Sequence, residues 1–131
     1  MSDWKTPADR HYAKTDEWIK VEGQEALVGL SDYAQDQLSD LVFVELPKVG
    51  AAYSAGQAFG VVESVKAAAD INLPAGGEII AVNNALESAP ETINQDPYGE
   101  GWIVRIKLSN PSELENLMDA AAYSVHCNER A

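Results

Sequence analysis

Short runs of β-branched and aromatic residues, bounded by Gly and Pro, recur along the chain and predict a mainly β protein. Residues 18–22 alternate between two faces and end beside Gly23, and an apolar run follows over 26–30, so these two runs predict a β-hairpin. The same reasoning predicts further strands over residues 41–46, 58–64, 69–73, 79–82 and 102–108. In the last of these, every second residue is apolar, which is typical of a strand with one buried face.

Two short helical stretches are predicted between the strands. Ser31 is a candidate N-cap for a helix that runs to Leu38, because Ala34 and Leu38 recur at helical spacing. Residues 83–94 are polar and rich in Ala, and they fit a helical turn followed by a loop. The Pro and Gly residues of 96–101 predict a turn.

The C-terminal part of the chain predicts an amphipathic helix over residues 111–126. Asn110 resembles its N-cap, Pro111 suits the first helical position, and Glu113 can reach back to the cap. We expect this helix to cover one end of the β core, and we expect the polar residues 1–11 to form an irregular lead-in. Its apolar residues follow helical spacing: Leu114, Leu117, Met118, Ala121 and Val125.

Length and charge narrow the functional classes. The 131 residues suffice for a single domain, 1–131, with its core over about residues 12–126. The net charge of -12 argues against nucleic acid and anionic membranes as partners, because both attract clusters of Lys and Arg. Such a charge fits a soluble carrier that meets several partners briefly. No stretch has the length of a membrane span and the N-terminus lacks an apolar signal core, so we expect a cytoplasmic protein, or a processed protein of the mitochondrial matrix.

Residue types that build enzyme active sites are present without the spacing that such sites need, so the chain is not expected to be an enzyme. Cys127 is the only cysteine and adjoins His126, but nothing nearby supplies an oxyanion site. Neither His11 nor His126 has metal-ligand partners at a recognisable spacing. Two acidic pairs are expected to be solvated surface charges: Asp16 with Glu17, and Glu87 with Glu91.

Lys66 stands apart from the other basic residues. It lies between the apolar runs 58–62 and 79–82, and Lys48 is the only other basic residue between Pro47 and Arg105. Most lysines between strands are ordinary solvated turn residues. A single amine in an acidic stretch, with small or compact neighbours, is also suited to one specific modification.

The string Glu63-Ser64-Val65-Lys66-Ala67-Ala68, followed by Asp70, resembles the lipoyl-attachment motif of the glycine cleavage system H-protein family. The resemblance extends over roughly residues 12–124 and departs at Asp16, where the family commonly has His, and at Ala75 and Gly76. If the family His helps to seat the lipoyl arm, Asp16 changes that contact. Three more segments resemble the family's other signatures: 28–35, 44–50 and 94–102.

The resemblance implies a lipoyl/biotinyl-domain-like sandwich of antiparallel sheets, with the modified lysine on a β-hairpin and with short helices and a C-terminal helix added. It also implies that lipoic acid is joined to Lys66 as an amide, which removes one positive charge and takes the net charge from -12 to -13. The function implied is that of a monomeric, non-catalytic carrier in glycine catabolism. Its partners would be a pyridoxal-phosphate glycine decarboxylase, a tetrahydrofolate-dependent aminomethyltransferase, dihydrolipoyl dehydrogenase, and a lipoate ligase or octanoyltransferase.

Within this resemblance, Glu63 and Asp70 are the candidate residues for recognition by the lipoylating enzyme. An H-like lipoyl donor in a lipoate relay to other enzymes stays open, because the sequence does not separate it from glycine cleavage. A biotin carrier usually has Met on both sides of its lysine, where this chain has Val65 and Ala67. A lipoyl domain of a 2-oxoacid dehydrogenase typically has Asp before its lysine and a catalytic domain after it, and a stand-alone enzyme is the most distant alternative.

Overall fold

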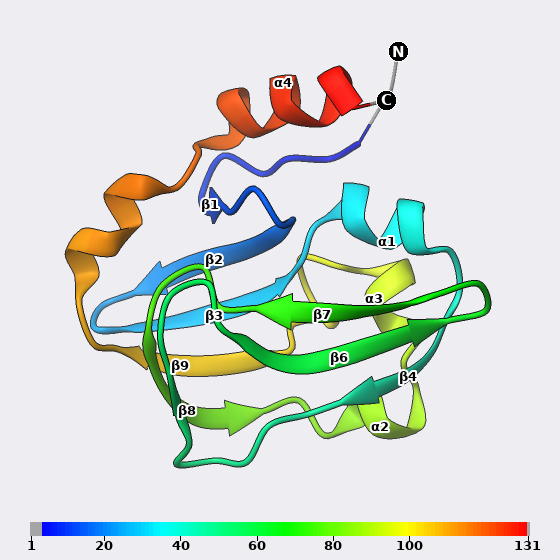
Figure 1. The fold of residues 1–131 in the computed structure, drawn as a ribbon, viewed down its shortest axis with the longest axis horizontal. Coiled ribbons are helices and arrows are strands. Elements are labelled where there is room, and N and C mark those ends of the chain that lie inside the picture. The colour runs from blue at the N-terminus through cyan, green and yellow to red at the C-terminus, as the bar shows by residue number, and fades with distance from the viewer. Residues whose placement is uncertain (1–3, 131) are drawn as a thin grey trace.

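The computed structural model describes residues 4–130, which form two antiparallel β-sheets and five helical segments (Figure 1). The larger sheet contains β1 (His11–Tyr12), β2 (Glu17–Glu22), β3 (Glu25–Leu30), β9 (Val104–Leu108), β8 (Gly77–Val82) and β5 (Ala52–Tyr53), in this spatial order. The smaller sheet contains β4 (Leu41–Glu45), β6 (Ala58–Ser64) and β7 (Ala68–Asn72). The helices are α1 (Asp32–Leu38), α2 (Ala85–Ser88), α3 (Thr92–Gln95), the 3-10 helix η1 (Pro111–Asn116) and α4 (Ala120–Arg130). The mainly β sandwich predicted from the sequence is confirmed.

The main core lies between the two sheets. Val28 and Ile106 contribute to it from the larger sheet, Val62 and Ile71 from the smaller one, and all four are fully buried. Burial of one such side chain stabilises a fold by roughly 1.5–3 kcal/mol, so this layer is the main reason that the sheets stay together. The smaller sheet thereby has one buried face and one open face.

Most predicted strands are confirmed, with differences at their ends. The strand over 58–64 and the β2–β3 hairpin are where the sequence placed them, and the Ser31 Oγ accepts a hydrogen bond from the Ala34 N–H at 3.1 Å as the cap of α1. β8 begins at Gly77, before the predicted start of this strand at residue 79. The lack of a side chain at Gly77 permits close pairing, since a Cβ there would lie 2.4 Å from the Lys107 carbonyl oxygen. β9 begins only at Val104; before it, the Asn83 amide donates a hydrogen bond to the Trp102 carbonyl at 2.7 Å.

The stretch 83–94, predicted to be a helical turn followed by a loop, contains α2, and a second short helix, α3, takes the place of the loop at its end. Leu86 of α2 and Ile93 of α3 are fully buried, so both helices pack their apolar residues on the core. A four-residue helix is too short to show helical periodicity in its sequence, which explains why the second helix was missed.

The continuous helix predicted over 111–126 is wrong. The chain forms η1, then an extended segment, then α4, because the Met118 backbone N–H and C=O each pair with Tyr12 at 2.9 Å and interrupt the helical ladder. This break changes which residues of α4 face inward: Tyr123 and Cys127 are buried, whereas Val125 is 56% exposed.

The predicted N-terminal cap of that helix is only partly confirmed. The Asn110 side chain accepts a hydrogen bond from the Ser112 N–H at 3.2 Å, as expected. The Glu113 carboxylate, however, accepts one from the Gly76 N–H at 2.9 Å and so ties η1 to the loop before β8. No helix among residues 4–130 is long and apolar enough to cross a membrane.

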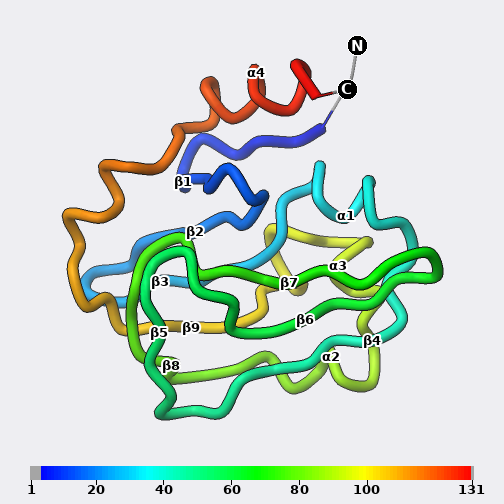
Figure 2. The backbone as a smooth tube through the Cα atoms, viewed as in Figure 1, coloured from blue at the N-terminus to red at the C-terminus, as the bar shows by residue number. Residues whose placement is uncertain are grey.

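A second, aromatic cluster lies between the larger sheet and α4 and is made of Tyr12, Trp18, Tyr33, Tyr123 and Cys127. Tyr12 and Tyr123 stack with their ring centroids 4.6 Å apart. The lead-in from Trp4 to Arg10 forms no helix or strand, but the Trp4 ring packs against Tyr33 at 4.6 Å. Figure 2 shows this N-terminal stretch running beside α4.

Candidate functional site

Lys66 lies in the tight turn that joins β6 to β7, and this turn projects at the edge of the molecule (Figure 2). The Ser64 N–H donates a hydrogen bond to the Ala67 carbonyl at 2.7 Å and closes the turn. The Ser64 Oγ accepts hydrogen bonds from the Lys66 N–H at 3.3 Å and from the Ala67 N–H at 3.1 Å. Ser64 therefore organises the turn without any contact to the Lys66 side chain.

The Lys66 side chain is exposed, and it has no hydrogen bond or ion pair with any residue in 4–130. Its neighbour Val65 is 70% exposed, and Ala67 and Ala68 are exposed as well. An amine in this setting is available to a reagent or an enzyme, because no salt bridge has to break before it reacts. Another active site can close around the turn from several directions.

The two acidic residues predicted to assist Lys66 lie on the open face of the smaller sheet. Glu63 pairs directly with Ala68, and Asp70 pairs with Val61, so the two carboxylates are diagonal neighbours across β6 and β7. Both residues are exposed. The structure thus brings Glu63, Lys66 and Asp70 onto one hairpin.

A hollow of about 180 Å³ lies beside this hairpin. Val62, Ala69 and Asp70 border it from the hairpin, and α1 and the turn before β2 form its other sides. Its lining combines apolar side chains with two acidic residues, Asp16 and Asp70. The remaining residues that line it are Thr15, Asp16, Leu30, Ala34, Gln37 and Leu38.

Glu17 follows Asp16 in the chain and is only 1% exposed, so its predicted place at the solvated surface is wrong. Its carboxylate accepts hydrogen bonds from the Thr15 hydroxyl and, at 3.0 Å, from the Asn72 N–H of β7. Burial raises the pKa of Glu17 from 4.5 to about 7, and the two hydrogen bonds oppose this shift. Glu17 therefore joins β2 to β7 through a carboxyl group that is poised near neutral pH.

Asp16 is also tied into the structure, in contrast to its predicted place among the solvated charges. Its φ is +83°, a left-handed conformation that Asp adopts more readily than most residues. Its carboxylate accepts hydrogen bonds from the Tyr123 hydroxyl at 2.8 Å and from Arg130 at 2.6 and 3.1 Å. The Arg130 guanidinium lies 4.2 Å from the Tyr33 ring centroid, so α4 is held on the wall of the hollow.

The other predicted surface charges are where they were expected, since Glu87 and Glu91 are exposed. Cys127 is buried beside Tyr123, and burial raises the pKa of its thiol. Within residues 4–130, no group of three or more His, Cys, Asp or Glu side chains is placed to hold a metal ion.

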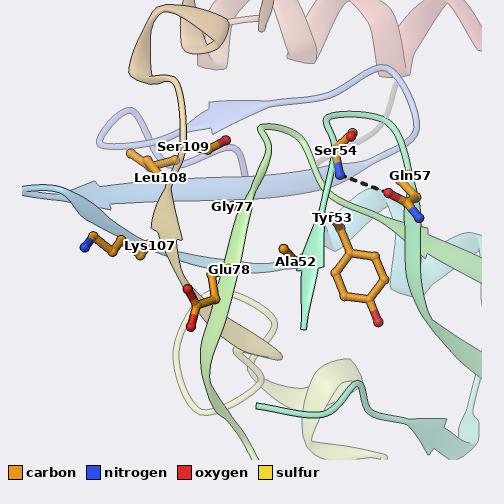
Figure 3. A pocket seen from close by; sticks show the side chains of 9 residues that line it. All are labelled: Ala52, Tyr53, Ser54, Gln57, Gly77, Glu78, Lys107, Leu108 and Ser109. Atoms are coloured by element: carbon orange, nitrogen blue, oxygen red, sulfur yellow. Dashed lines mark hydrogen bonds between the residues drawn. The ribbon is translucent and has the colours of Figure 1, made fainter. Parts of the chain in front are cut away.

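A larger hollow of about 460 Å³ lies at the β5 end of the larger sheet (Figure 3). Figure 3 shows the Ser54 N–H bonded to the Gln57 side chain at 2.9 Å on one side of it, and Lys107 pointing away from the other side chains. This hollow shares no lining residue with the one beside the hairpin. Its residues are Ala52, Tyr53, Ser54, Gln57, Gly77, Glu78, Lys107, Leu108 and Ser109.

The lysine and the two acidic residues predicted from the sequence lie on one hairpin, but the sequence did not predict the wall that contains Asp16. The signal for Glu17 was weak: it precedes the aromatic residue Trp18 at the start of a predicted strand, yet nothing in that pattern shows burial on both faces. The partners of Asp16 lie more than 100 positions away in the chain.

Comparison with known proteins adds an independent line of evidence. The family model described as "Glycine cleavage H-protein" matches residues 10–130. The glycine cleavage system H protein of Symbiobacterium thermophilum is 58% identical over 123 residues, which cover 94% of this chain and 96% of that protein. One from Thermus thermophilus is 56% identical over 117 residues, covering 89% of this chain and 91% of the relative. The crystal structure of a glycine cleavage system H protein from Mycobacterium marinum superposes with a TM-score of 0.84 at 39% identity, covering 91% of this chain and 96% of that one.

Proposed function

The chain belongs to the glycine cleavage H-protein family, and on this premise we propose that it is the lipoyl carrier of a glycine cleavage system, with Lys66 as the attachment residue. The observation that carries the assignment of Lys66 is its place in the structure. It is an exposed amine without a partner among the described residues, at the tip of a tight hairpin turn. We infer that residues 1–131 act as one lipoyl-bearing domain and that catalysis belongs to the partner enzymes.

The residues present fit a covalently attached lipoyl group. When bound, the lipoyl group supplies a disulfide that accepts the aminomethyl group derived from glycine. Lys66 supplies the anchor: its neutral amine attacks an activated lipoyl carbonyl, the C–N bond forms, and the activating group leaves with its electron pair while the amine loses a proton. Because the Ser64 contacts hold the backbone and leave the side chain free, the arm can swing from a rigid base.

We infer that the hollow beside the hairpin shelters the loaded arm between partners. Ala69 and Leu38, which are only partly buried, offer apolar contact, and Asp70 in the same lining is suited to an amine cargo. Asp16, which replaces the usual family His, is occupied by Arg130 and Tyr123. Its role in this proposal is therefore to hold the wall of the hollow.

We propose as partners the pyridoxal-phosphate glycine decarboxylase, the tetrahydrofolate-dependent aminomethyltransferase and dihydrolipoyl dehydrogenase, with a lipoate ligase or octanoyltransferase for attachment. Tethering supports such a role, because an arm on a fixed base raises the effective concentration of its cargo at each active site. The net charge of -12 supports steering toward basic docking surfaces. The bacterial relatives support a cytoplasmic location.

Reconstitution with purified partners tests the proposed function. The lipoylated protein is mixed with the decarboxylase, the aminomethyltransferase and the dehydrogenase, and NADH formation from glycine, tetrahydrofolate and NAD⁺ is followed. We expect the protein to support turnover, Lys66→Arg to abolish it, and the exposed control Lys48→Arg to leave it unchanged. Turnover by the Lys66→Arg variant would contradict the proposal. Lipoylation without turnover, combined with transfer of the lipoyl group to a separate acceptor domain, would favour the relay role instead.

Glu63 is proposed as a residue that helps the lipoylating enzyme to recognise the turn. We expect Glu63→Ala to slow lipoylation several-fold and to leave thermal unfolding unchanged, because the carboxylate is exposed. Asp70→Ala is the companion variant, with a smaller expected effect because its strand position is farther from the turn. Unchanged lipoylation kinetics in Glu63→Ala would remove Glu63 from this role.

A further inference from the structure

Three exposed apolar side chains lie beside the Lys66 turn. Val65 is 70% exposed, Val42 is 55% exposed and Phe43 is 46% exposed. The exposure of Val42 and Phe43 has a structural cause: the pairing of β4 with β6 shifts between Leu41 and Phe43, which leaves Val42 as the extra residue of a β-bulge. Two consecutive apolar residues therefore face solvent, while Leu41 and Val44 on either side are buried.

The strand register places Phe43 in the row next to the turn. Phe43 pairs with Glu63, and Glu63 pairs with Ala68, so these three residues cross the open face of the smaller sheet side by side. Neighbouring strands lie about 4.8 Å apart, so this row is compact enough for one partner surface to cover. The Val65 N–H donates a hydrogen bond to the Asp40 carbonyl at 3.1 Å, which holds the turn against the start of β4.

On the strands that carry the apolar patch (Val42, Phe43 and Val65) and on the turn between β6 and β7, all charged residues are acidic except Lys66. Glu45 lies in the next row of the same face, opposite Val61, which in turn pairs with Asp70. Lys66 is the only basic residue on β4, β6, β7 and the turn. The patch is therefore an apolar centre with an acidic rim: Asp40, Glu45, Glu63 and Asp70.

We propose that the apolar patch docks the enzyme that acylates Lys66, with an apolar surface on Phe43 and basic residues opposite the acidic rim. This inference rests on the proposed function and adds a recognition element on β4, outside the lysine motif. Before modification, the reactive nitrogen extends from the turn by one lysine side chain only, so the acylating active site must close over the turn and the row beside it. Partners that act later are reached by the longer lipoyl arm and need not cover Phe43.

Aromatic residues at the centre of an interface commonly contribute most of the binding free energy, whereas isolated exposed apolar residues have no such role. Val125 is as exposed as Val42 but lies on α4, which packs on the aromatic cluster and not on the smaller sheet. It therefore provides a matched control, because its substitution removes an exposed apolar group of the same kind outside the smaller sheet.

The test is the steady-state rate of lipoylation by a purified lipoate ligase with ATP and lipoate. We expect Phe43→Ser to lower kcat/KM about tenfold or more, mainly by raising KM for the carrier. Phe43→Leu should recover most of the rate, and Val125→Ser should match the wild type. Equal rates for Phe43→Ser and wild type, or an equal loss in Val125→Ser, would overturn the proposal.

Two controls separate docking from other causes. Acetylation of Lys66 by acetic anhydride, followed by peptide mass spectrometry, should proceed equally in wild type and Phe43→Ser; a slower reaction in the variant would show a distorted turn and overturn the docking role. Absence of any lipoylation in the wild type, with a competent carrier modified in the same assay, would contradict the proposed function itself. Normal lipoylation of Phe43→Ser with slowed glycine cleavage would overturn this inference and assign the patch to a later partner.

Discussion

The turn around Lys66 and the wall of the hollow beside it are built in opposite ways. The turn is closed by its own backbone and by Ser64, two residues from the lysine. The wall is closed by contacts between distant parts of the chain: Glu17 bonds to β7, and Asp16 bonds to Arg130 at the end of α4. Lys66, the proposed attachment residue, thus lies in a turn that contributes little to the stability of the fold, whereas Asp16 and Glu17 bond segments that are far apart in the sequence.

Because the turn and the wall are built differently, substitutions in the two regions should have different effects. A substitution in the turn changes what can be attached or recognised and should scarcely change the free energy of unfolding. A substitution in the wall should change the free energy of unfolding and the shape of the hollow, although Asp16 and Glu17 have no hydrogen bond or ion pair with Lys66. Variants in both regions test this separation, beginning with the wall.

The largest effect is expected from the titration of Glu17. Its pKa is 4.5 in the unfolded chain and about 7 in the fold, so between these values the folded state holds the proton more tightly. Glu17 therefore makes its full contribution to the free energy of unfolding below pH 4.5, and this contribution is lost as the pH rises through 7. The loss is at most about 3 kcal/mol. Glu17→Gln does not titrate and should lack this loss.

Urea unfolding of wild type and Glu17→Gln across pH 4.5–8 measures the effect. As the pH rises, the unfolding free energy of the wild type should fall relative to that of Glu17→Gln. Glu87→Gln, in which an exposed carboxylate is neutralised, should instead follow the wild type at every pH. Parallel curves for wild type and Glu17→Gln would show that Glu17 titrates as an ordinary carboxylate.

A smaller effect is expected from Arg130→Ala. The variant loses two hydrogen bonds to Asp16 and the contact with the Tyr33 ring, but the Arg130 side chain is 32% exposed, so solvent weakens the ion pair. We expect a loss of about 1 kcal/mol in unfolding free energy that shrinks as salt is added.

Hydrogen exchange gives this prediction a local measurement. The Ser31 N–H donates to the Asp16 carbonyl at 2.9 Å, and its exchange should become faster in Arg130→Ala. Arg105→Ala removes two ion pairs of similar exposure, to Glu22 and Glu25 at the turn end of the β2–β3 hairpin, and should leave Ser31 exchange unchanged. Faster exchange in both variants would indicate general loosening in place of a specific wall contact.

In the turn, Ser64→Ala should cost only about 0.5 kcal/mol, because the lost hydrogen bonds are exposed and water replaces them. The backbone bond between Ser64 and Ala67 remains, so the hairpin should persist. Thermal unfolding measures the loss. A loss above about 2 kcal/mol would show that the turn contributes to the fold as strongly as the wall.

The smallest effect on stability is expected from Lys66→Arg. The Lys66 side chain has no partner within residues 4–130, so the unfolding curve should coincide with that of the wild type. Lipoylation should nevertheless be lost, because a guanidinium is a poor acyl acceptor. A clearly shifted unfolding midpoint would reveal a structural role for the lysine.

The same contrast explains what the sequence could predict. Strand β6, the β2–β3 hairpin and the capped helix α1 depend on neighbouring residues and were predicted closely. The hairpin that carries Lys66 followed from a local motif. Burial of Glu17 and the contact of Asp16 with Arg130 depend on segments that meet only in the fold, so no local pattern could indicate them.

The helix at the C-terminus shows the same limit in another form. Its predicted apolar face assumed one unbroken helix, and the pairing of Met118 with Tyr12 divides it and changes the inward-facing residues of α4. Residues 41–46 were predicted as a strand, but the sequence pattern did not reveal the β-bulge that leaves Phe43 exposed. In both places, pairing with a segment that is distant in the sequence decides which apolar residues face inward.

The central claim, that Lys66 anchors the lipoyl group, is tested most directly by mass spectrometry of the intact protein and its peptides after incubation with lipoate, ATP and a lipoate ligase. We expect one lipoyl adduct, located on the peptide that contains Lys66, and no adduct in Lys66→Arg. An unmodified mass, when a competent carrier in the same tube is fully modified, would contradict the claim, as would an adduct on any other lysine.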